Sequence, residues 1–279
     1  MKKIKTFDFN DLQLEIEIKD LSFVIEAQKV LGKPHRTSFY QLIWLTSGQM
    51  TFIIDFKPTT IHKNEMLLIT CGQVCQFDIT SKYKGYAILF TPSFLSESEL
   101  DTNFIYTSEI FNPINLNKSF NLPHQVLQSL ITLLKNEINL PPDQHQHKIA
   151  RSYMRAILLQ MERHYIQPIN NTFNPKVREF INAVEKNYKN NRQTSFYAKL
   201  LNLREKALNS KLDSVLGKSA KEYIDSRIIL EAKRYLSYSN LSVKEIGFNL
   251  GFDEPTNFNK YFRKHTNTTP LKFREQHSK

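Results

Sequence analysis

Polar side chains suited to hydrogen bonding with nucleic-acid bases are concentrated between residues 256 and 264, in the run TNFNKYFRK. Asn259 offers a donor and an acceptor that match an adenine edge, and Lys260 offers donors that match guanine. Arg263 and Lys264 carry the positive charge that suits phosphate groups. This combination indicates contacts with the major groove of DNA, provided that one exposed helix presents all of these residues.

The aromatic residues in the same run predict such a helix. Phe258, Tyr261 and Phe262 follow the spacing i, i+3, i+4, which places them on one buried face and leaves the polar residues outside. Pro255 suits the first turn of this helix, where its missing N–H costs nothing.

A second, shorter helix is predicted just before it. Ser242 and Glu245 have the S-x-x-E spacing of a capping box, so this helix should begin at Val243. Gly251 follows the apolar positions Ile246 and Leu250, and glycine enters a left-handed turn at no steric cost. Helix, tight turn and helix together predict a helix-turn-helix.

The same pattern occurs earlier in the chain, with Asn202 in the place of Gly251. Asparagine is the next best residue for a left-handed turn. The offset between matching residues is 49 before the turn and 50 after it. The matching pairs are Ala198 with Gly247, Leu201 with Leu250, Leu203 with Phe252, Leu208 with Phe258, Leu212 with Phe262, Gly217 with Asn267, and Tyr223 with Phe273. Agreement of both turn and core residues indicates an internal repeat.

Residues 175–279 resemble the DNA-binding domain of the AraC/XylS family of bacterial transcription regulators, most closely in LSVKEIGFNLGFDEPTNFNKYFRKHTNTTPLKFR, residues 241–274. The resemblance implies two helix-turn-helices that insert recognition helices into adjacent major grooves. A long helix joins them, here from Ser219, with Glu222 completing a second capping box, to about Leu236. The first repeat departs from the family pattern at Ala207, Ser210 and Leu212.

The resemblance also implies which residues contact DNA. Base contacts are carried over to Lys206, Asn209 and Ser210 in the first recognition helix, and to Thr256, Asn257, Asn259 and Lys260 in the second. Phosphate contacts are expected at Arg204, Lys211, Arg263 and Lys264. The alternative for each residue alone is a solvated helix face.

Charge separates the two parts of the chain. The net charge is +11, and residues 175–279 carry 21 Lys or Arg against 11 Asp or Glu, compared with 17 against 16 in residues 1–174. Confinement of the positive charge to the segment with the repeat is typical of a module that binds a polyanion.

The N-terminal part is predicted to form short strands over residues 39–45, 50–56, 65–70 and 85–90, with a turn at Ser47-Gly48-Gln49 and breaks at Lys57-Pro58 and Cys71-Gly72. The order resembles the cupin-like sensor domain of the same family. The expected fold class is therefore α+β: a cupin-like β-barrel with a helical dimerisation segment, then an all-α domain with two helix-turn-helix motifs.

The expected domain bounds are 1–165 for the sensor and dimerisation domain, with the barrel at about 1–110 and a helical pair at about 122–165. A linker is expected at 166–174 and the DNA-binding domain at 175–279. The resemblance implies that the helical pair is a dimer interface; a stripe packed on its own barrel explains the same apolar pattern.

The barrel lacks the usual ligands of a metal-binding cupin. Cys71 and Cys75 replace the proline and histidine of the usual motif, so we expect no metal, no cofactor and no catalytic residues. His35, Arg36, Tyr40 and Trp44 are candidate effector-binding residues. The alternatives are a surface or satisfied barrel-mouth histidine at His35, and ordinary core at Tyr40 and Trp44.

Three other features of the sequence bear on function. The two cysteines are predicted to be half-buried strand or loop residues, with a redox or metal role as the alternative. His145 and His147 are expected in a solvated loop. No apolar run is long enough to span a membrane and the N-terminus has no secretory signal, so the chain is expected in the cytoplasm.

The expected partners are double-stranded DNA, RNA polymerase, a small-molecule effector and a second copy of the chain, with no membrane. Three hypotheses remain open from the sequence: a regulator that responds to an effector, a regulator of the same fold controlled by abundance or a partner protein, and a cupin enzyme fused to a DNA-targeting module. The missing ligand histidines count against the third.

Overall fold

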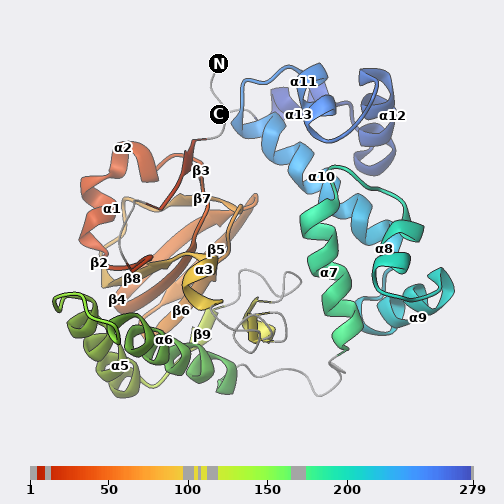
Figure 1. The fold of residues 1–279 in the computed structure, drawn as a ribbon. Coiled ribbons are helices and arrows are strands. Elements are labelled where there is room, and N and C mark those ends of the chain that lie inside the picture. The colour runs from red at the N-terminus through yellow and green to blue at the C-terminus, as the bar shows by residue number, and fades with distance from the viewer. Residues whose placement is uncertain are drawn as a thin grey trace. The chain divides into compact units, whose positions relative to one another are not determined.

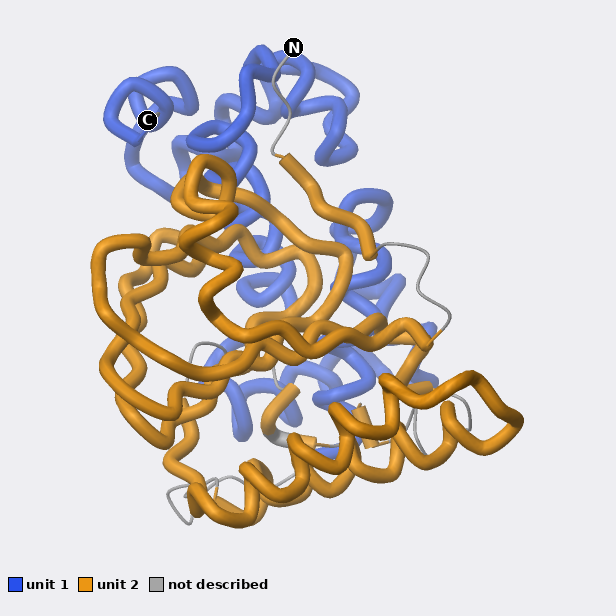
Figure 2. The backbone as a smooth tube through the Cα atoms, turned by 90° about the vertical axis from the view of Figure 1, so that its left-hand side faces the viewer, with its two compact units in different colours: residues 1–4, 168–279 blue, residues 5–167 orange. Residues whose placement is uncertain are grey.

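The computed structural model describes residues 5–9, 14–96, 104–105, 108–111, 119–164 and 174–277. They belong to two compact units: the first in chain order, residues 5–167, is labelled unit 2 and drawn orange in Figure 2, and the second, which includes residues 168–279, is labelled unit 1 and drawn blue. Of the expected linker at 166–174, all but Asn174 lies outside the described residues. Figure 1 shows a sheet with helices in the first unit and a set of helices in the second.

A curled sheet forms the first unit. Its described strands are β1 (Thr6–Phe7), β2 (Ile16–Asp20), β3 (His35–Thr37), β4 (Tyr40–Ile54), β5 (Lys57–His62), β6 (Glu65–Ile69), β7 (Val74–Phe77), β8 (Tyr83–Phe90) and β9 (Ser119–Asn121). The described helices are α1 (Ser22–Glu26), α2 (Gln28–Leu31), α3 (Pro92–Leu95), the 3-10 turn η1 (Glu109–Phe111), α5 (His124–Ile138) and α6 (Gln146–Arg163).

Strand β4 connects the two halves of this sheet. Its first part pairs with β6 and β8, and its second part pairs with β5 and β7. The expected turn at residues 47–49 is wrong, because β4 continues through Gly48 with a shift of register between Leu45 and Ser47. Gly48 has φ +78°, and a Cβ there would lie 2.1 Å from the Lys82 carbonyl oxygen. Glycine therefore allows a bend where a turn was expected.

The two faces of β4 pack against different cores, because successive side chains of a strand point to opposite sides. Leu42 and Trp44 pack in the core that includes Leu127 of α5 and Ile157 of α6. Ile43 and Leu45 pack in a second core on the opposite face. The alternation thus places Tyr40 and Trp44, two of the candidate effector residues, on the face that packs against α5 and α6.

Two features of the first unit were not predicted. Helices α1 and α2 lie before the first of the predicted strands, which begins at residue 39. Lys57 and Pro58, expected to break the sheet, begin β5 instead, which pairs only with β4 among the described strands. Proline is tolerated there because an edge strand leaves one row of its N–H groups without sheet partners.

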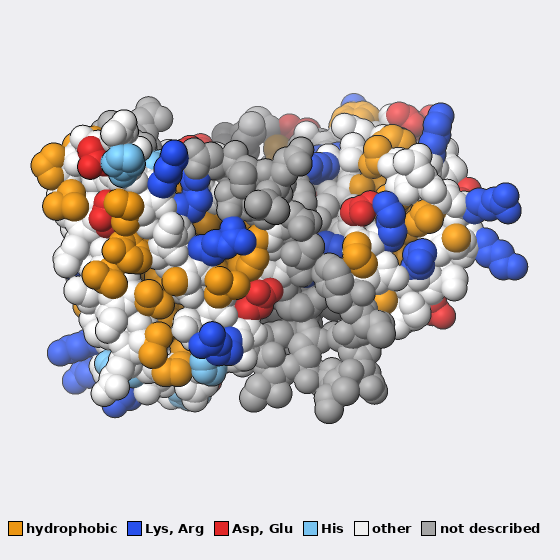
Figure 3. Space-filling view, turned by 60° about the horizontal axis from the view of Figure 1, so that its bottom comes forward, with side chains coloured by type: hydrophobic (Ala, Val, Ile, Leu, Met, Phe, Trp, Pro, Cys, Tyr) orange, Lys and Arg blue, Asp and Glu red, His pale blue; other side chains and the backbone are white. Residues whose placement is uncertain are grey.

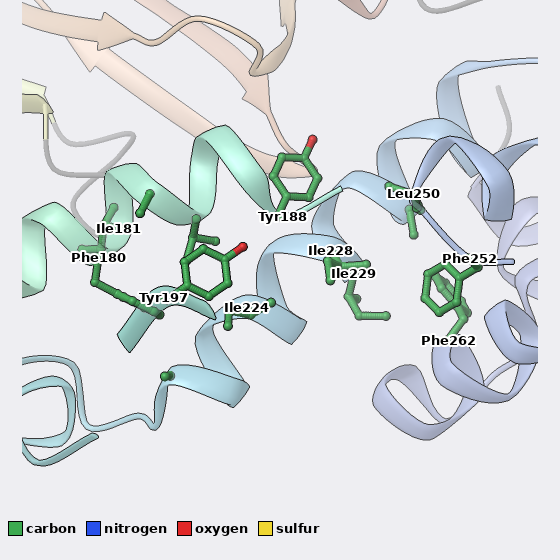
Figure 4. Close-up of a cluster of buried hydrophobic side chains, with 14 of the residues drawn as sticks. Phe180, Ile181, Tyr188, Tyr197, Ile224, Ile228, Ile229, Leu250, Phe252 and Phe262 are labelled. Carbon is green, nitrogen blue, oxygen red and sulfur yellow. The ribbon is translucent and has the colours of Figure 1, made fainter. Parts of the chain in front are cut away.

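The described residues of the second unit form α7 (Pro175–Asn187), α8 (Thr194–Leu200), α9 (Glu205–Leu216), α10 (Ala220–Tyr238), α11 (Val243–Asn249), α12 (Pro255–Thr266) and α13 (Pro270–His277). One hydrophobic core runs through the unit, and Figure 4 shows Phe180, Ile224 and Phe262 within it. The predicted helix starts at Val243 and after Ser219 are confirmed, with both capping boxes formed.

Candidate nucleic-acid interface and cavity

Two helix-turn-helices of matching geometry lie in the second unit. The first consists of α8 and α9, and the second of α11 and α12. Asn202 and Gly251 occupy the turns with φ of 54° and 76°, and Gly217 and Asn267 end the second helices with φ of 59° and 58°. All four residues are left-handed, so the repeat predicted from the sequence is confirmed at the backbone.

The turn of the second motif packs closely on the segment that follows α7. A Cβ on Gly251 would lie 1.9 Å from the Lys189 carbonyl oxygen, so glycine is needed for space as well as for its φ. Arg192 donates to the Gly251 carbonyl at 2.7 Å and lies 4.0 Å from the centre of the Phe252 ring. Sequence reasoning missed Arg192, because its partners lie 59 and 60 residues away.

Helix α12 presents its polar residues to solvent. Phe258 and Phe262 are fully buried and Tyr261 is half-buried, as the helical spacing predicts. The residues expected to contact DNA on this helix are all exposed: Thr256, Asn257, Asn259, Lys260, Arg263 and Lys264. The structure thus places all six on one accessible surface.

A buried carboxylate holds α12 against α10. Tyr261 donates to Asp225 Oδ1 at 2.7 Å, and His265 Nε2 lies 3.5 Å from Asp225 Oδ2. Burial and the neighbouring Asp225 raise the pKa of the Tyr261 hydroxyl, so the hydroxyl remains a donor at neutral pH. Asp225 is only 6% exposed, and nothing in the local sequence pointed to this contact.

Helix α9 exposes fewer of its expected DNA-contacting residues to solvent than α12 does. Arg204, Lys206 and Ser210 are exposed, whereas Asn209 and Lys211 are half-buried. The Asn209 side-chain oxygen accepts the backbone N–H of Ala220 at 2.9 Å. The two repeats therefore differ in how accessible their matching asparagines are.

Ion pairs connect α7 to α10 beneath these motifs. Arg227 donates to Glu185 at 2.8 Å and to Glu231 at 3.2 Å, and Arg234 donates to Glu231 at 2.9 Å. Burial disfavours the charge on Arg227, but Glu185, Tyr188 and Glu231 outweigh burial and raise its pKa. We assign this network a structural role, because Glu231 and Arg234 are buried and the pair of Arg227 with Glu185 joins α10 to α7.

A cavity of about 280 Å³ lies in the first unit. Its lining is mainly apolar, and His35, Thr37 and Gln41 are the buried polar residues among it. The other lining residues are Phe7, Asp8, Phe9, Glu17, Lys19, Phe23, Ala27, Val30, Leu31, Phe39 and Leu89. Such a space suits a small molecule held by packing and a few hydrogen bonds.

His35 is 1% exposed, so the alternative of a surface histidine is wrong. Its Nδ1 lies 2.9 Å from the Lys33 carbonyl oxygen and its Nε2 lies 3.4 Å from Cys75 Sγ. Because a carbonyl only accepts, Nδ1 carries the proton in this pair and the thiol donates to Nε2. Burial lowers the pKa of His35, with a smaller opposing effect from the bond to Lys33.

The other candidate effector residues lie away from this cavity's lining. Tyr40 stacks on Phe90 at 5.2 Å, and the fully buried Trp44 stacks on Tyr86 at 6.2 Å, both within the core that faces α5 and α6. Arg36 is half-buried in β3, next to His35. Effector contacts by these three residues remain predictions.

The cysteines are poorly suited to nucleophilic chemistry. Cys75 is fully buried and Cys71 is partly buried, and both are free. Burial raises the pKa of each thiol to about 12, so neither is a thiolate at neutral pH.

The expectation that His145 and His147 lie in a solvated loop is wrong for His147. It lies in the first turn of α6, where its Nδ1 is 2.6 Å from an Arg151 nitrogen. Among the described residues, no group of three His, Cys, Asp or Glu side chains is placed to hold a metal ion.

None of the described helices is both long enough and apolar enough to cross a membrane.

Comparison with known families covers both units. Residues 197–276 match a family described as a helix-turn-helix domain, and residues 23–161 match the AraC-like ligand binding domain. The match to residues 23–161 includes most strands of the sheet, most of the residues that line the cavity, all of α5 and nearly all of α6.

Two curated proteins are similar in sequence. The probable transcription factor PqrA of Proteus vulgaris is 43% identical over 54 residues, which span 19% of this chain and 44% of that protein. The HTH-type transcriptional activator RhaR of Cronobacter sakazakii is 21% identical over 249 residues, which span 87% of this chain and 86% of RhaR.

Among solved structures, ToxT of Vibrio cholerae matches with 15% identity and a TM-score of 0.44, covering 95% of this chain and 98% of ToxT. A regulator with an AraC-type DNA-binding domain from Chromobacterium violaceum matches with 25% identity and a TM-score of 0.34. That match covers 38% of this chain and 94% of the Chromobacterium protein.

Proposed function

The chain belongs to the AraC family of transcription regulators, and we propose that it recognises specific DNA sites with α9 and α12 under the control of a small molecule bound in its first unit. One observation carries this proposal: α12 exposes a continuous set of Asn, Thr, Lys and Arg side chains above a fully buried aromatic face. That arrangement fits direct readout in a major groove.

The phosphate-contacting residues extend the same surface. Arg263 and Lys264 are exposed in the last turn of α12, and Arg204 is exposed at the start of α9. We assign them to the DNA backbone, where each cation releases a counterion and makes affinity depend on salt. Because chromosomal DNA is the proposed target, we place the protein in the cytoplasm.

The cavity supports control by an effector. Its aromatic and aliphatic lining favours a largely apolar ligand, and the Gln41 side chain and Lys19 offer polar contacts at its wall. A bound effector alters DNA binding only if it binds two arrangements of the protein with different affinity. The relatives are transcription regulators, and we propose no catalytic activity for this chain.

An apolar stripe on α5 supports dimerisation with a second copy. Val126 and Leu133 of α5 are 40% and 45% exposed, with Leu130 between them, and Leu140, just after the end of α5, is 55% exposed and continues the seven-residue spacing. This heptad spacing suits packing against another helix. Figure 3 shows hydrophobic side chains gathered on the face that brings α5 and α6 forward. RNA polymerase is a further proposed partner, on the basis of family membership.

Binding of the full-length protein to upstream fragments of its own genome tests the proposal. We expect a small subset of fragments to bind tightly, with log affinity falling linearly with log salt at about −0.9 per phosphate contacted. Equal affinity for every fragment, with and without added cell extract metabolites, would contradict sequence-specific regulation.

A thermal-shift screen of small molecules tests the effector. A ligand that binds only the folded state raises the melting temperature by mass action. The substitution Leu31→Trp, which adds bulk at the cavity wall, should abolish the shift, whereas Leu271→Trp at an exposed site in the other unit should not. A shift that survives Leu31→Trp would place the ligand elsewhere.

A further inference from the structure

We propose that the two matching asparagines of the repeats have different tasks, and this rests on the proposed function. Asn259 reads an adenine, whereas Asn209 is a positioning residue that holds the start of α10 and does not discriminate between bases. The two residues lie 50 positions apart and occupy the same place in their recognition helices.

The first step concerns what Asn209 already binds. Its Oδ1 accepts the N–H of Ala220 at 2.9 Å, and Ala220 is fully buried as the first residue of α10. The first N–H groups of a helix have no partner within the helix. The Ser219 side chain accepts the N–H of Glu222, and the capping box provides no acceptor for the N–H of Ala220. Asn209 supplies that acceptor.

This bond fixes the orientation of the Asn209 amide. A backbone N–H requires an oxygen acceptor, so the oxygen of Asn209 is held at Ala220 by one of its two lone pairs, and turning both groups of the amide onto a base edge would break that bond. A pair of hydrogen bonds to adenine needs both groups, since the oxygen accepts from N6 and the NH₂ donates to N7. A lone donor is accepted by adenine N7, guanine N7 and thymine O4 alike, so it carries little sequence information.

The second repeat removes the need for this bond. The residue 50 positions after Ala220 is Pro270, the first residue of α13, and proline has no N–H. Thr269 takes the place of Ser219, accepting the N–H of Lys272 at 3.3 Å. The second repeat therefore keeps the side-chain cap at the start of α13, but it has no backbone N–H equivalent to that of Ala220.

Asn259 is consequently free to face DNA. It is exposed, and within the described part of the chain its side chain makes no hydrogen bond. Its oxygen and NH₂ group are both available for an adenine edge. In the first repeat, the backbone N–H of Ala220 engages the side chain of Asn209. In the second repeat, Pro270 has no N–H, so the side chain of Asn259 has no such partner.

Asparagine-to-aspartate substitutions separate the two tasks, because aspartate keeps the acceptor and loses the NH₂ group. In full-length protein, Asn259→Asp should reduce discrimination at one A·T base pair by about tenfold or more. Asn209→Asp should leave the discrimination at every base pair within about twofold of wild type. For each protein variant, discrimination is the ratio of its affinity for the chosen DNA site to its affinity for a single-base variant of that site. The effect of the added negative charge on overall affinity cancels in this ratio.

Amide hydrogen exchange at Ala220 provides a readout without DNA. Exchange should accelerate in Asn209→Ala, remain slow in Asn209→Asp, and remain unchanged in Asn259→Ala. Unchanged exchange in Asn209→Ala would overturn the positioning role. Loss of discrimination at a single base pair in Asn209→Asp would overturn it too. Wild-type protein with no preference for any DNA sequence would contradict the proposed function, while the exchange result would still decide the role of Asn209.

Discussion

Single side chains on α12 differ in what their loss should do, because base contacts and phosphate contacts respond differently to sequence. Lys260 is exposed beside Asn259, on the face opposite the buried Phe258 and Phe262. We expect Lys260→Ala to cost about 1–3 kcal/mol on the recognised site and to relax specificity at one base pair. Fluorescence anisotropy with the site and its single-base variants measures both effects.

The control for this change is Lys29→Ala, which removes an exposed lysine from the first unit. It should leave affinity within a few tenths of a kcal/mol of wild type. If Lys260→Ala weakened binding equally on all DNA sequences, the side chain would be a phosphate contact and its assignment to a base would be wrong.

His35 makes stability depend on pH in a defined direction. Its folded pKa lies below the unfolded value of about 6.5, so below that pH the unfolded chain binds a proton that the folded chain resists. Stability from this residue is complete above about pH 6.5 and decreases as the pH falls towards the folded pKa. Thermal unfolding at pH 7.5 and 5.5 measures the decrease.

Two variants isolate the histidine responsible. His35→Gln should flatten the pH dependence, whereas His62→Gln, at an exposed site, should leave it unchanged. Equal pH dependence in wild type and His35→Gln would show that His35 is not the group that titrates.

Residue types and spacing predicted the exposed face of α12 but not the bonds beneath it. Polar and aromatic positions on one helix follow a period that the sequence displays directly. The contacts of Tyr261 with Asp225 and of Asn209 with Ala220 join residues 36 and 11 positions apart. Such contacts depend on how helices pack, and no local pattern records them.

At the scale of elements, the turn of the second motif depends on Gly251 for two separate reasons. Its φ is +76°, and a Cβ would lie 1.9 Å from the Lys189 carbonyl oxygen. We expect Gly251→Ala to destabilise the protein by at least about 2 kcal/mol. The loss combines the strain of a left-handed alanine with displacement of the Lys189 backbone by the new Cβ. Chemical denaturation followed by circular dichroism measures the change.

Gly217 provides the matched comparison, because its φ is +59° but a Cβ there would contact nothing within 4 Å. Gly217→Ala should therefore cost about 1–2 kcal/mol from the left-handed conformation alone. Equal losses in the two variants would mean that close approach to Lys189 contributes nothing.

The exposed stripe on α5 makes a prediction about association. Leu133 is 45% exposed in the middle of the stripe, and Leu133→Asp should raise the dimer dissociation constant by more than about tenfold. Sedimentation of the full-length protein over a range of concentrations measures it. Leu271→Asp, at a leucine that is 58% exposed in the second unit, should leave association unchanged.

The sequence predicted helix ends better than it predicted the sheet. Capping boxes at Ser219 and Ser242 are local signals with a specific spacing, and both formed as expected. The course of β4 through Gly48 was not predictable, because a glycine after serine is typical of both a turn and a bend within a strand. Pairing of Gly48 with Tyr83 of β8, 35 residues later in the chain, decides between them.

For the whole molecule, the separate cores of the two units predict that the second unit folds alone. A fragment of residues 174–279 retains Asn174, whose side chain caps α7 by accepting the N–H of Lys176. We expect it to be monomeric and to bind the same DNA site more weakly than the full chain, because it lacks α5. Tight dimerisation of this fragment would contradict the assignment of the interface to α5.

Helix α10 also determines which arrangements of DNA sequence the protein can recognise. It has 19 residues and is therefore about 28 Å long, somewhat shorter than the roughly 34 Å of one turn of the double helix. One residue added within it would rotate one motif about the helix axis by about 100° relative to the other. We therefore expect α10 to set the spacing between the two half-sites, so that a base pair inserted between them puts one recognition helix out of phase with its groove.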